Sequence, residues 1–319
     1  NLVAVITNGT AVLGLGDIGA AAGKPVMEGK AVLFKRFGGI DAIDLEVDTK
    51  NPAAFIQAVR LLETSFGGIN LEDIKAPECF EIETALQNAM KIPVFHDDQH
   101  GTAVVAGAAL LNALRLTGRK IENLNVVFCG AGAAGLACAS LFLKLGVKPG
   151  KLVLTDRSGV VFSGRQENMD LYKSRFASQT TARTLQEALI GADLFVGVAT
   201  GNVLTGEMIS RMNPDPVIFA LANPIPEIDP FLARKIRPDV ILATGRSDLP
   251  NQINNLLGFP FIFRGALDSR ASRVTPGMKR AAVHALAALA RDATDRTPGL
   301  PEFGRNALLP SPFDPRLLW

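Results

Sequence analysis

The sequence predicts an α/β fold in two lobes, each built on a parallel sheet. Short apolar runs typical of buried strands, such as 2–6 and 125–129, alternate with stretches that have helical character. Several of these runs end in acids, amides or glycines, which is where open parallel sheets bind ligands. One run leads directly into a glycine-rich turn and a helix, an arrangement that suits the binding of a phosphate group.

Length and composition fit a globular enzyme with a sizeable core. The chain has 319 residues, of which 48% are hydrophobic and 20% are charged. Its formal net charge of +2 is too small to indicate binding to nucleic acid or to an anionic membrane. No apolar run reaches the roughly 18 residues that a membrane-spanning helix needs.

The cysteines indicate the cellular compartment of the protein, and the first residue indicates whether a further segment precedes this sequence. Cys79, Cys129 and Cys138 show no CxxC spacing, which favours a reducing compartment, and we expect a cytoplasmic protein. The chain begins with Asn1, and a strand pattern starts at the next residue. We therefore expect that an N-terminal segment of the natural protein precedes this sequence.

The first lobe reads as strands separated by two helices. Strands are predicted at 2–6, 11–15, 30–37, 42–48, 69–74 and 92–95. Asn51 and Pro52 open a helix that ends near Gly67, a second helix covers 77–90, and a third, at 102–116, leads into the second lobe. The glycines between 14 and 19 are interpreted as serving a tight turn and close packing, because an isolated glycine motif is weak evidence for phosphate binding.

Two pairs of adjacent acids follow predicted strands of this lobe. They are Glu72 with Asp73, and Asp97 with Asp98. Carboxylates at neighbouring strand ends are the ligands that Mg²⁺ or Mn²⁺ prefers. Because side chains alternate along a strand, the two members of a pair should point in different directions. One acid of the second pair is therefore expected to bind a metal while the other meets a different partner.

Histidines and lysines are the candidates for a proton acceptor near such a metal. His96, His100 and His284 each have an equally good structural interpretation as packing, turn or helix residues. A lysine near a cation and away from water can have its pKa lowered and act as a base. Lys24 and Lys30 are the two candidates, and the residue pattern alone does not choose between them.

The second lobe carries the pattern of a Rossmann-like dinucleotide site. The strand at 125–129 runs into Gly-Ala-Gly-Ala-Ala-Gly at 130–135, and a helix at 136–145 and a strand at 151–156 follow. Further strands are predicted at 192–198, 216–221 and 239–243, and a helix at 278–291. The predicted cofactor-binding residues of this pattern are Gly130, Ala131, Gly132, Ala133, Ala134, Gly135, Asp156 and Arg157.

The choice between NAD⁺ and NADP⁺ depends on the residues at the end of the predicted strand 151–156. Asp156 suits the free ribose 2′-hydroxyl of NAD⁺, whereas Arg157 with Ser158 suits the 2′-phosphate of NADP⁺. The residues themselves leave both cofactors open.

Five segments, taken in order, are similar to the signature segments of malic enzymes. They lie at 6–19, 68–73, 95–102, 130–135 and 219–224, and so cover most of the chain. Residues 303–304 and 312–316 also resemble the end of the malic domain in bacterial hybrid enzymes, which carry a phosphotransacetylase-like domain afterwards. The resemblance implies oxidative decarboxylation of (S)-malate to pyruvate and CO₂, and a homo-oligomer, a dimer or larger. It implies Mg²⁺ or Mn²⁺ and NAD⁺ or NADP⁺ as cofactors, and the hybrid type favours NADP⁺.

The resemblance also implies roles for particular residues. The implied metal ligands are Glu72, Asp73 and Asp98. Lys30 matches the general base of the family and Asp97 matches the acid that partners it. Asn223 and Asn255 match residues that hold the substrate or the nicotinamide.

Two family residues have no match here. The tyrosine that protonates the product in the family lies upstream of the position that matches Asn1, and Tyr172, the only tyrosine of the chain, does not match it. An arginine that contacts malate in the long animal-type enzymes is Ala11 here, and Arg246 is the residue we expect to replace it.

These patterns predict three segments and leave two other functions open. We expect a truncated catalytic lobe at 1–102, a Rossmann-like cofactor domain at 103–277, and a helix and tail at 278–319 that pack back on the catalytic lobe. The alternatives are another NAD(P)-dependent hydroxy-acid or amino-acid dehydrogenase, and a non-catalytic nucleotide-binding or assembly module of a larger protein. The first would not need two pairs of acids.

Overall fold

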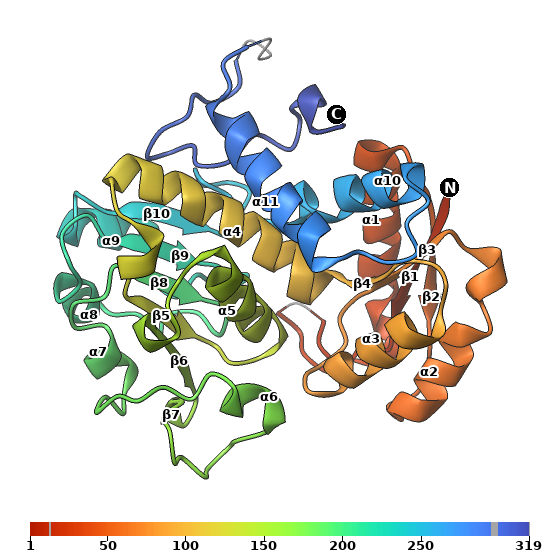
Figure 1. The fold of residues 1–319 in the computed structure, drawn as a ribbon, viewed down its shortest axis with the longest axis horizontal. Helices are drawn as coiled ribbons and strands as arrows, with labels where there is room; N and C mark the ends of the chain where they lie inside the picture. Colours follow the sequence, from red (N-terminus) through yellow and green to blue (C-terminus); the bar gives the residue numbers. More distant parts are fainter. Residues whose placement is uncertain (13, 295–298, 319) are drawn as a thin grey trace. The chain divides into compact units, whose positions relative to one another are not determined.

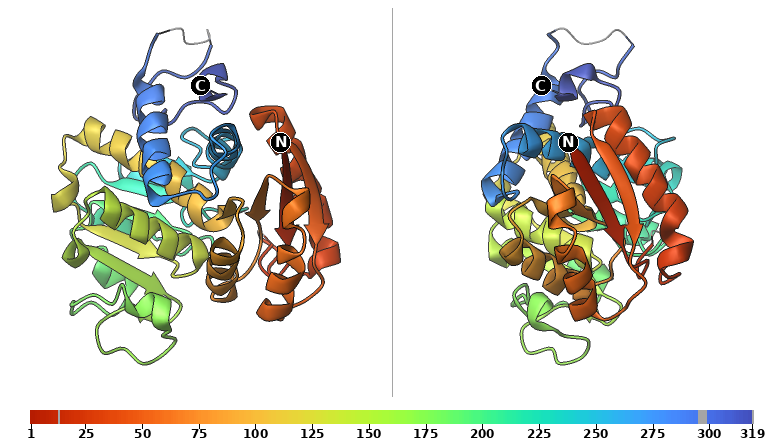
Figure 2. Two further views of the ribbon diagram at one scale, coloured as in Figure 1. Left: turned by 45° about the vertical axis from the view of Figure 1, so that its right-hand side comes forward. Right: turned by 90° about the vertical axis from the view of Figure 1, so that its right-hand side faces the viewer.

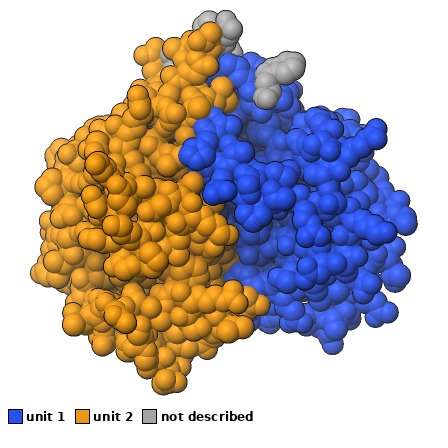
Figure 3. Space-filling model, viewed as in Figure 1, with its two compact units in different colours: residues 1–104, 255–285, 312–319 blue, residues 105–254, 286–311 orange. Residues whose placement is uncertain are grey.

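The computed structural model describes residues 1–12, 14–294 and 299–318. The chain divides into two compact units, coloured separately in Figure 3. Unit 1 comprises residues 1–104, 255–285 and 312–319, and unit 2 comprises 105–254 and 286–311. These limits differ from the predicted domains, because 255–277 clusters with unit 1 and most of the segment from 286 clusters with unit 2.

Unit 1 contains a four-stranded parallel sheet with the order β2-β1-β3-β4 (Figure 2). The strands are β1 (Leu2–Thr7), β2 (Asp41–Glu46), β3 (Gly68–Leu71) and β4 (Val94–His96). Val3 and Val5 of β1 pack with Phe34 and Phe263 from helices α1 (Ala20–Gly38) and α10 (Phe259–Asp268). Ala4 and Ile6 are also fully buried, so both faces of β1 are covered.

The remaining helices of unit 1 surround this sheet. Helix α2 (Pro52–Arg60) packs on α3 (Glu78–Ala89), which also contacts β4. As predicted, α2 starts after Asn51, whose side chain accepts from the amides of Ala53 and Ala54, although the helix ends well before Gly67. Short 3-10 turns lie at Glu63–Ser65, Asn255–Leu257 and Pro315–Leu318.

Two predicted strands of unit 1 are wrong. Residues 30–37 belong to α1, where Met27, Lys30 and Phe34 are buried at helical spacing. Among 11–15, residue 13 lies outside the described residues, and the others form a turn with an isolated bridge from Val12 to Gly16. This turn includes Gly16 and Gly19 at positive φ. A Cβ on Gly9 would lie 2.1 Å from the carbonyl oxygen of Gly19, which supports the packing interpretation of the glycines.

Unit 2 contains a six-stranded sheet with the order β10-β9-β8-β5-β6-β7 (Figure 1). All neighbours are parallel except β7, which is antiparallel to β6. The strands are β5 (Val126–Cys129), β6 (Leu152–Asp156), β7 (Gly159–Val160), β8 (Leu194–Gly197), β9 (Val217–Ala220) and β10 (Ile241–Thr244). The chain leaves β5 for β6 on one side and reaches β8 on the other, so the strand order reverses at β5, as in a doubly wound sheet.

Helices cover both faces of this sheet. Phe128 of β5 stacks on Phe142 of α5 (Ala133–Leu145), with ring centroids 5.5 Å apart. Val127, which points the other way, packs in a core with Ile209 of α8 (Gly206–Ser210) and Ala233 of α9 (Pro230–Ile236). Shorter elements are α6 (Leu171–Ser174), α7 (Leu185–Ala188) and the 3-10 turns Ile121–Asn123 and Pro149–Lys151.

Two long helices run from one unit into the other. They are α4 (Asp97–Thr117) and α11 (Pro276–Arg291). Helix α4 begins at Asp97, five residues before the predicted start at Thr102, and this places both acids of the second pair in its first turn. Among the described residues, no helix combines the length and the apolar character needed to cross a bilayer.

Candidate active site

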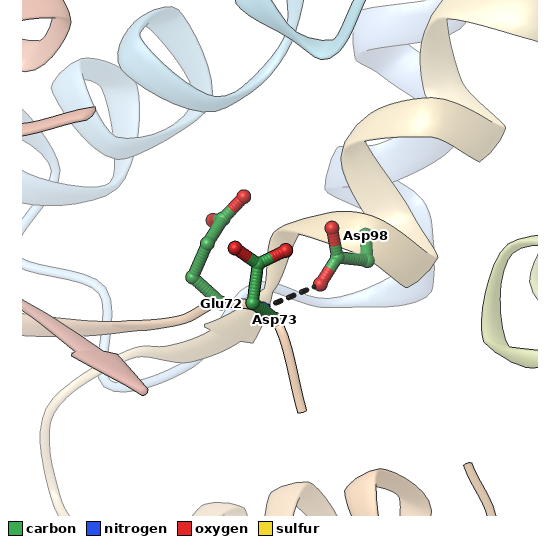
Figure 4. Close-up of side chains that lie close together, drawn as sticks. All are labelled: Glu72, Asp73 and Asp98. Carbon is green, nitrogen blue, oxygen red and sulfur yellow. Dashed lines mark hydrogen bonds between the residues drawn. The ribbon is translucent and has the colours of Figure 1, made fainter. Parts of the chain in front are cut away.

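Three carboxylates of unit 1 converge at the end of β3 (Figure 4). Glu72 and Asp73 follow β3 directly, and Asp98 comes from the first turn of α4. One carboxylate oxygen from each lies within 4.8 Å of the others. We call these three residues the acid cluster, and they are the three residues predicted to bind a metal.

The backbone between β3 and α4 fixes the acid cluster. The amide of Asp73 donates a hydrogen bond of 2.8 Å to Oδ2 of Asp98, drawn as the dashed line in Figure 4. Asp73 has φ +54°, a left-handed conformation that is uncommon outside glycine. Strained backbone of this kind persists where surrounding structure enforces it, often at functional sites.

The charge of the acid cluster matches a divalent cation. The acid cluster and Asp97 together hold four carboxylates, and the ammonium group of Lys30 contacts two of them, those of Glu72 and Asp97. Burial raises the pKa values of Glu72 and Asp98, because a buried negative charge without compensation is costly. Oxygen ligands and excess negative charge suit Mg²⁺ or Mn²⁺, so the donor set fits the predicted metal.

Lys30 adjoins the acid cluster from α1. Its side chain is 8% exposed, and Nζ lies 3.0 Å from Oε1 of Glu72 and in hydrogen-bond contact with Oδ2 of Asp97. The same Nζ stands 3.8 Å from the ring centre of Phe259 in α10. Burial alone would lower the pKa of Lys30, but the charges of Asp97 and Glu72 outweigh it and raise that pKa.

Asp97 joins Lys30 to Asn255. The Asn255 amide donates a hydrogen bond of 2.5 Å to Oδ2 of Asp97, the same oxygen that contacts Lys30. The other oxygen of Asp97 is buried and has no hydrogen-bond partner among the described residues. Burial raises the pKa of Asp97 well above its usual value. A Cβ at Gly101, one turn along α4, would lie 1.8 Å from that second oxygen, so the glycine makes room for the carboxylate.

The two acids of the second pair separate as predicted, although the predicted reason is wrong. Asp98 lies in the acid cluster and Asp97 contacts Lys30. Strand alternation does not cause this division, because both residues belong to α4. Consecutive residues of a helix point about 100° apart, and this angle directs the two carboxylates to different partners.

The structure distinguishes the two candidate lysines. Lys24 is about half exposed and pairs with Asp44 of β2, with Nζ 2.5 Å from Oδ2. It also lies 3.5 Å from both Glu28 and Glu46, and none of these ion-pair partners belongs to the acid cluster. Lys30 alone of the two adjoins the predicted metal ligands.

Of the histidines, His96 lies beside the acid cluster, with Nδ1 3.8 Å from Oδ2 of Asp98. His96 is fully buried, and burial lowers its pKa to about 4, so the ring is neutral. His100 lies 3.0 Å from Oε2 of Glu83 and 3.2 Å from Nζ of Lys279. His284 is exposed on α11.

Sequence reasoning missed several residues around this site. Asn70 donates a hydrogen bond of 2.8 Å to Oε2 of Glu72, and its position as a polar residue inside an apolar strand was an available signal. Buried Glu83 accepts from the amide of His96 and from the side chain of Gln99, which anchors the start of α4. The contact of Phe259 with Lys30 had no local signal, because the two residues are far apart in the sequence.

The glycine turn after β5 in unit 2 has the geometry of a dinucleotide site. Gly130 has φ +115°, and a Cβ there would lie 2.7 Å from the carbonyl oxygen of Val198. A Cβ at Gly135 would lie 1.9 Å from the carbonyl oxygen of Gly130, whereas one at Gly132 would meet nothing within 4 Å. The first and third glycines therefore allow close packing, while the second leaves open space beside the N-terminus of α5. Ala131 completes this turn, and Ala133 and Ala134 begin α5.

Asp156 is already engaged by basic side chains. Arg165 Nη2 lies 2.8 and 2.6 Å from its two oxygens, and Lys173 Nζ lies 3.0 Å from Oδ2. Asn168 and the amide of Ser158 also donate to it. Burial alone would raise the pKa of Asp156, but the hydrogen bonds from Arg165 and Lys173 lower it.

Most of the remaining predicted residues belong to unit 2. Asn223 belongs to unit 2, whereas Asn255 belongs to unit 1, where it contacts Asp97. Arg246, expected to meet a substrate carboxylate, is paired with Asp248 through bonds of 2.8 and 2.6 Å. Arg157 is exposed next to Asp156, and Tyr172 lies in α6 of unit 2.

Two protein families match most of the chain. Residues 2–87 match the malic enzyme N-terminal domain, and residues 99–306 match the malic enzyme NAD-binding domain. The boundary between the matches falls at the start of α4, close to the end of the first segment of unit 1.

Individual relatives agree with these matches. The chain is 56% identical to an NADP-dependent malic enzyme of Halomonas elongata, over all of this chain and 76% of that protein. It is also 56% identical to an NADP-dependent malic enzyme of Rhizobium meliloti, but it spans only 43% of that protein. The crystal structure of an NAD-dependent malic enzyme from Thermotoga maritima is 48% identical, with a TM-score of 0.91 over all of this chain and 82% of that one.

Proposed function

The chain belongs to the malic enzyme family, and from this premise we propose that it converts (S)-malate and NADP⁺ to pyruvate, CO₂ and NADPH. One observation carries the proposal. Lys30, the expected base, contacts Glu72, which is itself one of the three clustered carboxylates. A proton acceptor and an oxygen-rich metal site in direct contact are what the oxidation of a 2-hydroxy acid followed by decarboxylation requires.

The acid cluster would hold Mg²⁺ or Mn²⁺ through Glu72, Asp73 and Asp98. When bound, such a metal supplies Lewis acidity toward the oxygens of the substrate, and NADP⁺ supplies the hydride acceptor. By holding the metal, the three carboxylates would fix the place at which the oxygens of the substrate bind.

Lys30 takes the proton of the malate 2-hydroxyl in this proposal. To do so it must be neutral, whereas the charges of Asp97 and Glu72 hold it protonated. Neutralisation of the Glu72 charge in the loaded site removes part of that effect and brings the lysine closer to a working base. Asp97 keeps Nζ in place, and Asn255 fixes the carboxylate of Asp97 from its other side.

We propose NADP⁺ rather than NAD⁺ as the preferred cofactor. Arg165 and Lys173 neutralise Asp156, so this carboxylate is poorly placed to repel a 2′-phosphate or to hold a free 2′-hydroxyl. Arg157 is exposed beside it. We expect Arg157→Ser to raise the KM for NADP⁺ by about tenfold, the scale of a charge-assisted hydrogen bond, with little change for NAD⁺.

Malate-dependent NADPH formation tests the proposed reaction. Activity should require Mn²⁺ or Mg²⁺, should stop with EDTA and should return when metal is added back. A protein that binds NADP⁺ but shows no malate-dependent reduction at any metal concentration would instead support the nucleotide-binding alternative. Oxidation of malate without release of CO₂ would support an ordinary hydroxy-acid dehydrogenase.

We also propose a cytoplasmic homo-oligomer, followed in the full-length protein by a phosphotransacetylase-like domain. Support for the location comes from Cys79, Cys129 and Cys138, which are buried and unpaired by disulfides. Support for the further domain comes from the hybrid-type segments near the end of the sequence and from the length of the Rhizobium relative. Cell fractionation, light scattering and the downstream coding sequence test these three points.

A further inference from the structure

Glu227 is a fully buried carboxylate in the loop between β9 and α9 of unit 2. No salt bridge reaches it from the residues that the structure describes, and its hydrogen-bond partners are backbone amides. A buried acid without a cation is unusual and costs free energy, so its retention calls for a local explanation.

The carboxylate of Glu227 ties two loops together. Its Oε1 accepts from the amide of Ala199, at 3.2 Å, in the loop after β8. Its Oε2 accepts from the amide of Ala222, at 3.0 Å, in the loop after β9. The backbone of the same segment adds two links, because the amides of Asn202 and Leu204 donate to the carbonyl oxygens of Pro226 and Glu227.

Three glycines make room for the segment that contains Glu227. A Cβ at Gly197 would lie 2.3 Å from Cδ of Glu227, and one at Gly201 would lie 2.7 Å from Cβ of Ile225. A Cβ at Gly245, in the loop after β10, would lie 2.5 Å from Nδ2 of Asn223. The segment 223–227 is therefore seated closely against the loops after β8 and β10.

These loops border the cofactor crevice. The strand order reverses at β5, and a doubly wound sheet binds its ligand beyond the carboxyl ends of the strands at that point. Val198, next to Ala199, already touches Gly130 of the glycine turn through the close approach described above. Asn223, expected to meet the nicotinamide or substrate, directly follows Ala222.

We propose that Glu227 is a positioning residue for the dinucleotide, whose carboxylate holds the loops after β8 and β9 at the spacing that cofactor binding requires. This inference rests on the proposed function, because it takes the crevice to bind NADP⁺. Glu227 itself does not touch the cofactor. It acts through the backbone of Ala199 and Ala222.

The positioning role makes cofactor affinity depend on pH. Burial raises the pKa of Glu227 to about 7, while the amides of Ala222 and Ala199 pull that pKa down. Protonation converts one acceptor oxygen into a donor, which then opposes an amide N–H. The titratable side chain facing Glu227 from the neighbouring strand is Cys129, whose pKa burial raises to about 11, so its thiol stays neutral in this range.

Calorimetry tests the proposal by measuring the Kd of NADP⁺ for the wild type, Glu227→Gln and Glu207→Gln. The glutamine keeps the shape but turns an N–H₂ group toward one of the two amides, so we expect Kd to rise about tenfold at about pH 8. The wild-type Kd for NADP⁺ should rise by a similar factor as the pH falls from about 8 to about 6. The Kd of Glu227→Gln should not show this rise. Glu207, an exposed acid on α8 paired with Arg211, is the matched control and should behave as the wild type.

Two further measurements separate positioning from loss of folding. Mn²⁺ affinity depends on carboxylates of unit 1 and should be unchanged in Glu227→Gln. Gly197→Ala keeps the acid but displaces its carboxylate, and should weaken NADP⁺ binding even if Glu227→Gln proves too unstable to assay. If the wild type, Glu227→Gln and Gly197→Ala had equal Kd values for NADP⁺ and equal pH dependence, the inference would be overturned and the proposed function would stand. A wild type that binds no dinucleotide would overturn both.

Discussion

Lys30 and Glu72 form a buried ion pair in which Nζ lies 3.0 Å from Oε1. The expected proton acceptor therefore shares a contact with an expected metal ligand. Metal binding and proton transfer are electrostatically coupled at this pair, because a charge change on Glu72 is felt directly by the lysine.

Replacement of the buried lysine should abolish most of the turnover. Because Lys30→Ala removes the ammonium group that contacts Glu72 and Asp97, we expect kcat to fall by about 10²–10⁴-fold, the usual contribution of a general base. Steady-state kinetics at saturating malate and Mn²⁺ measure the effect. Lys24→Ala, on the same helix but paired at the surface with Asp44, is the control and should stay close to the wild type. Near-normal turnover in Lys30→Ala would remove this residue from the role of base.

Removal of the charge on Asp97 should shift the pH profile downward. Burial lowers the pKa of Lys30, and the charges of Asp97 and Glu72 raise it further than burial lowers it. Asp97→Asn deletes one of those two charges while keeping a hydrogen-bonding side chain, so the lysine loses its proton at a lower pH. The rising acidic limb of kcat/KM should then move to lower pH, even though the maximum falls. A shift to higher pH, or no shift, would contradict the assignment of that limb to Lys30.

Metal affinity should depend on Asp98. Asp98→Asn removes one charged ligand of the acid cluster, and we expect the Kd for Mn²⁺ to rise at least about tenfold, the scale of one lost charge-assisted contact. Mn²⁺ at 100 times its Kd should stabilise the wild type by about 2.7 kcal/mol, and the variant should lose about half of this gain or more at the same concentration. Thermal unfolding with and without metal measures it. Asp41→Asn, an exposed acid paired with Lys35, serves as the control.

Strand and helix patterns were sufficient to locate the main parts of both units. The family and the α/β fold predicted from the sequence are confirmed, and β3, β4, β5 and β6 lie where apolar runs placed them. The glycine turn was recognisable because its strand, helix and following strand are consecutive in the chain. Local patterns of this kind carry their own context.

Errors occurred where the same local pattern fits two structures. The apolar run at 31–34 fits a strand and a buried helix equally well, and α1 also contains Pro25, which usually argues against a helix. The early start of α4 had a signal, since acids are favoured in the first turn of a helix, but the preceding strand obscured it. The contact of Asn255 with Asp97, which are 158 positions apart, follows only from the tertiary fold.

A single methyl group at Gly101 should disturb the site. Gly101→Ala places a Cβ 1.8 Å from Oδ1 of Asp97, which must move or tilt α4. We expect a loss of about 1–3 kcal/mol in unfolding free energy, typical of overpacking, together with a fall in kcat as Asp97 leaves Lys30. Gly265→Ala is the matched control in helix α10, because a Cβ there meets nothing within 4 Å and should stabilise the protein by about 0.5–1 kcal/mol. A Gly101→Ala variant with wild-type kcat would show that Asp97 tolerates displacement.

Glu227 should destabilise the protein at alkaline pH even though it orders the cofactor loops. Its folded pKa of about 7 lies above the reference value of 4.5, so the folded state holds this proton more tightly than the unfolded state. The stabilising contribution of this residue is therefore complete below its unfolded-state pKa of 4.5, and it is lost as the pH rises through about 7. From the pKa difference, the loss is about 3 kcal/mol. Urea unfolding of the wild type and Glu227→Gln across this pH range measures it, and the free-energy difference between the two should change in favour of the glutamine variant as pH rises. Parallel pH curves for the two proteins would place the titration of Glu227 outside this range and would remove the physical basis for a pH-dependent cofactor affinity.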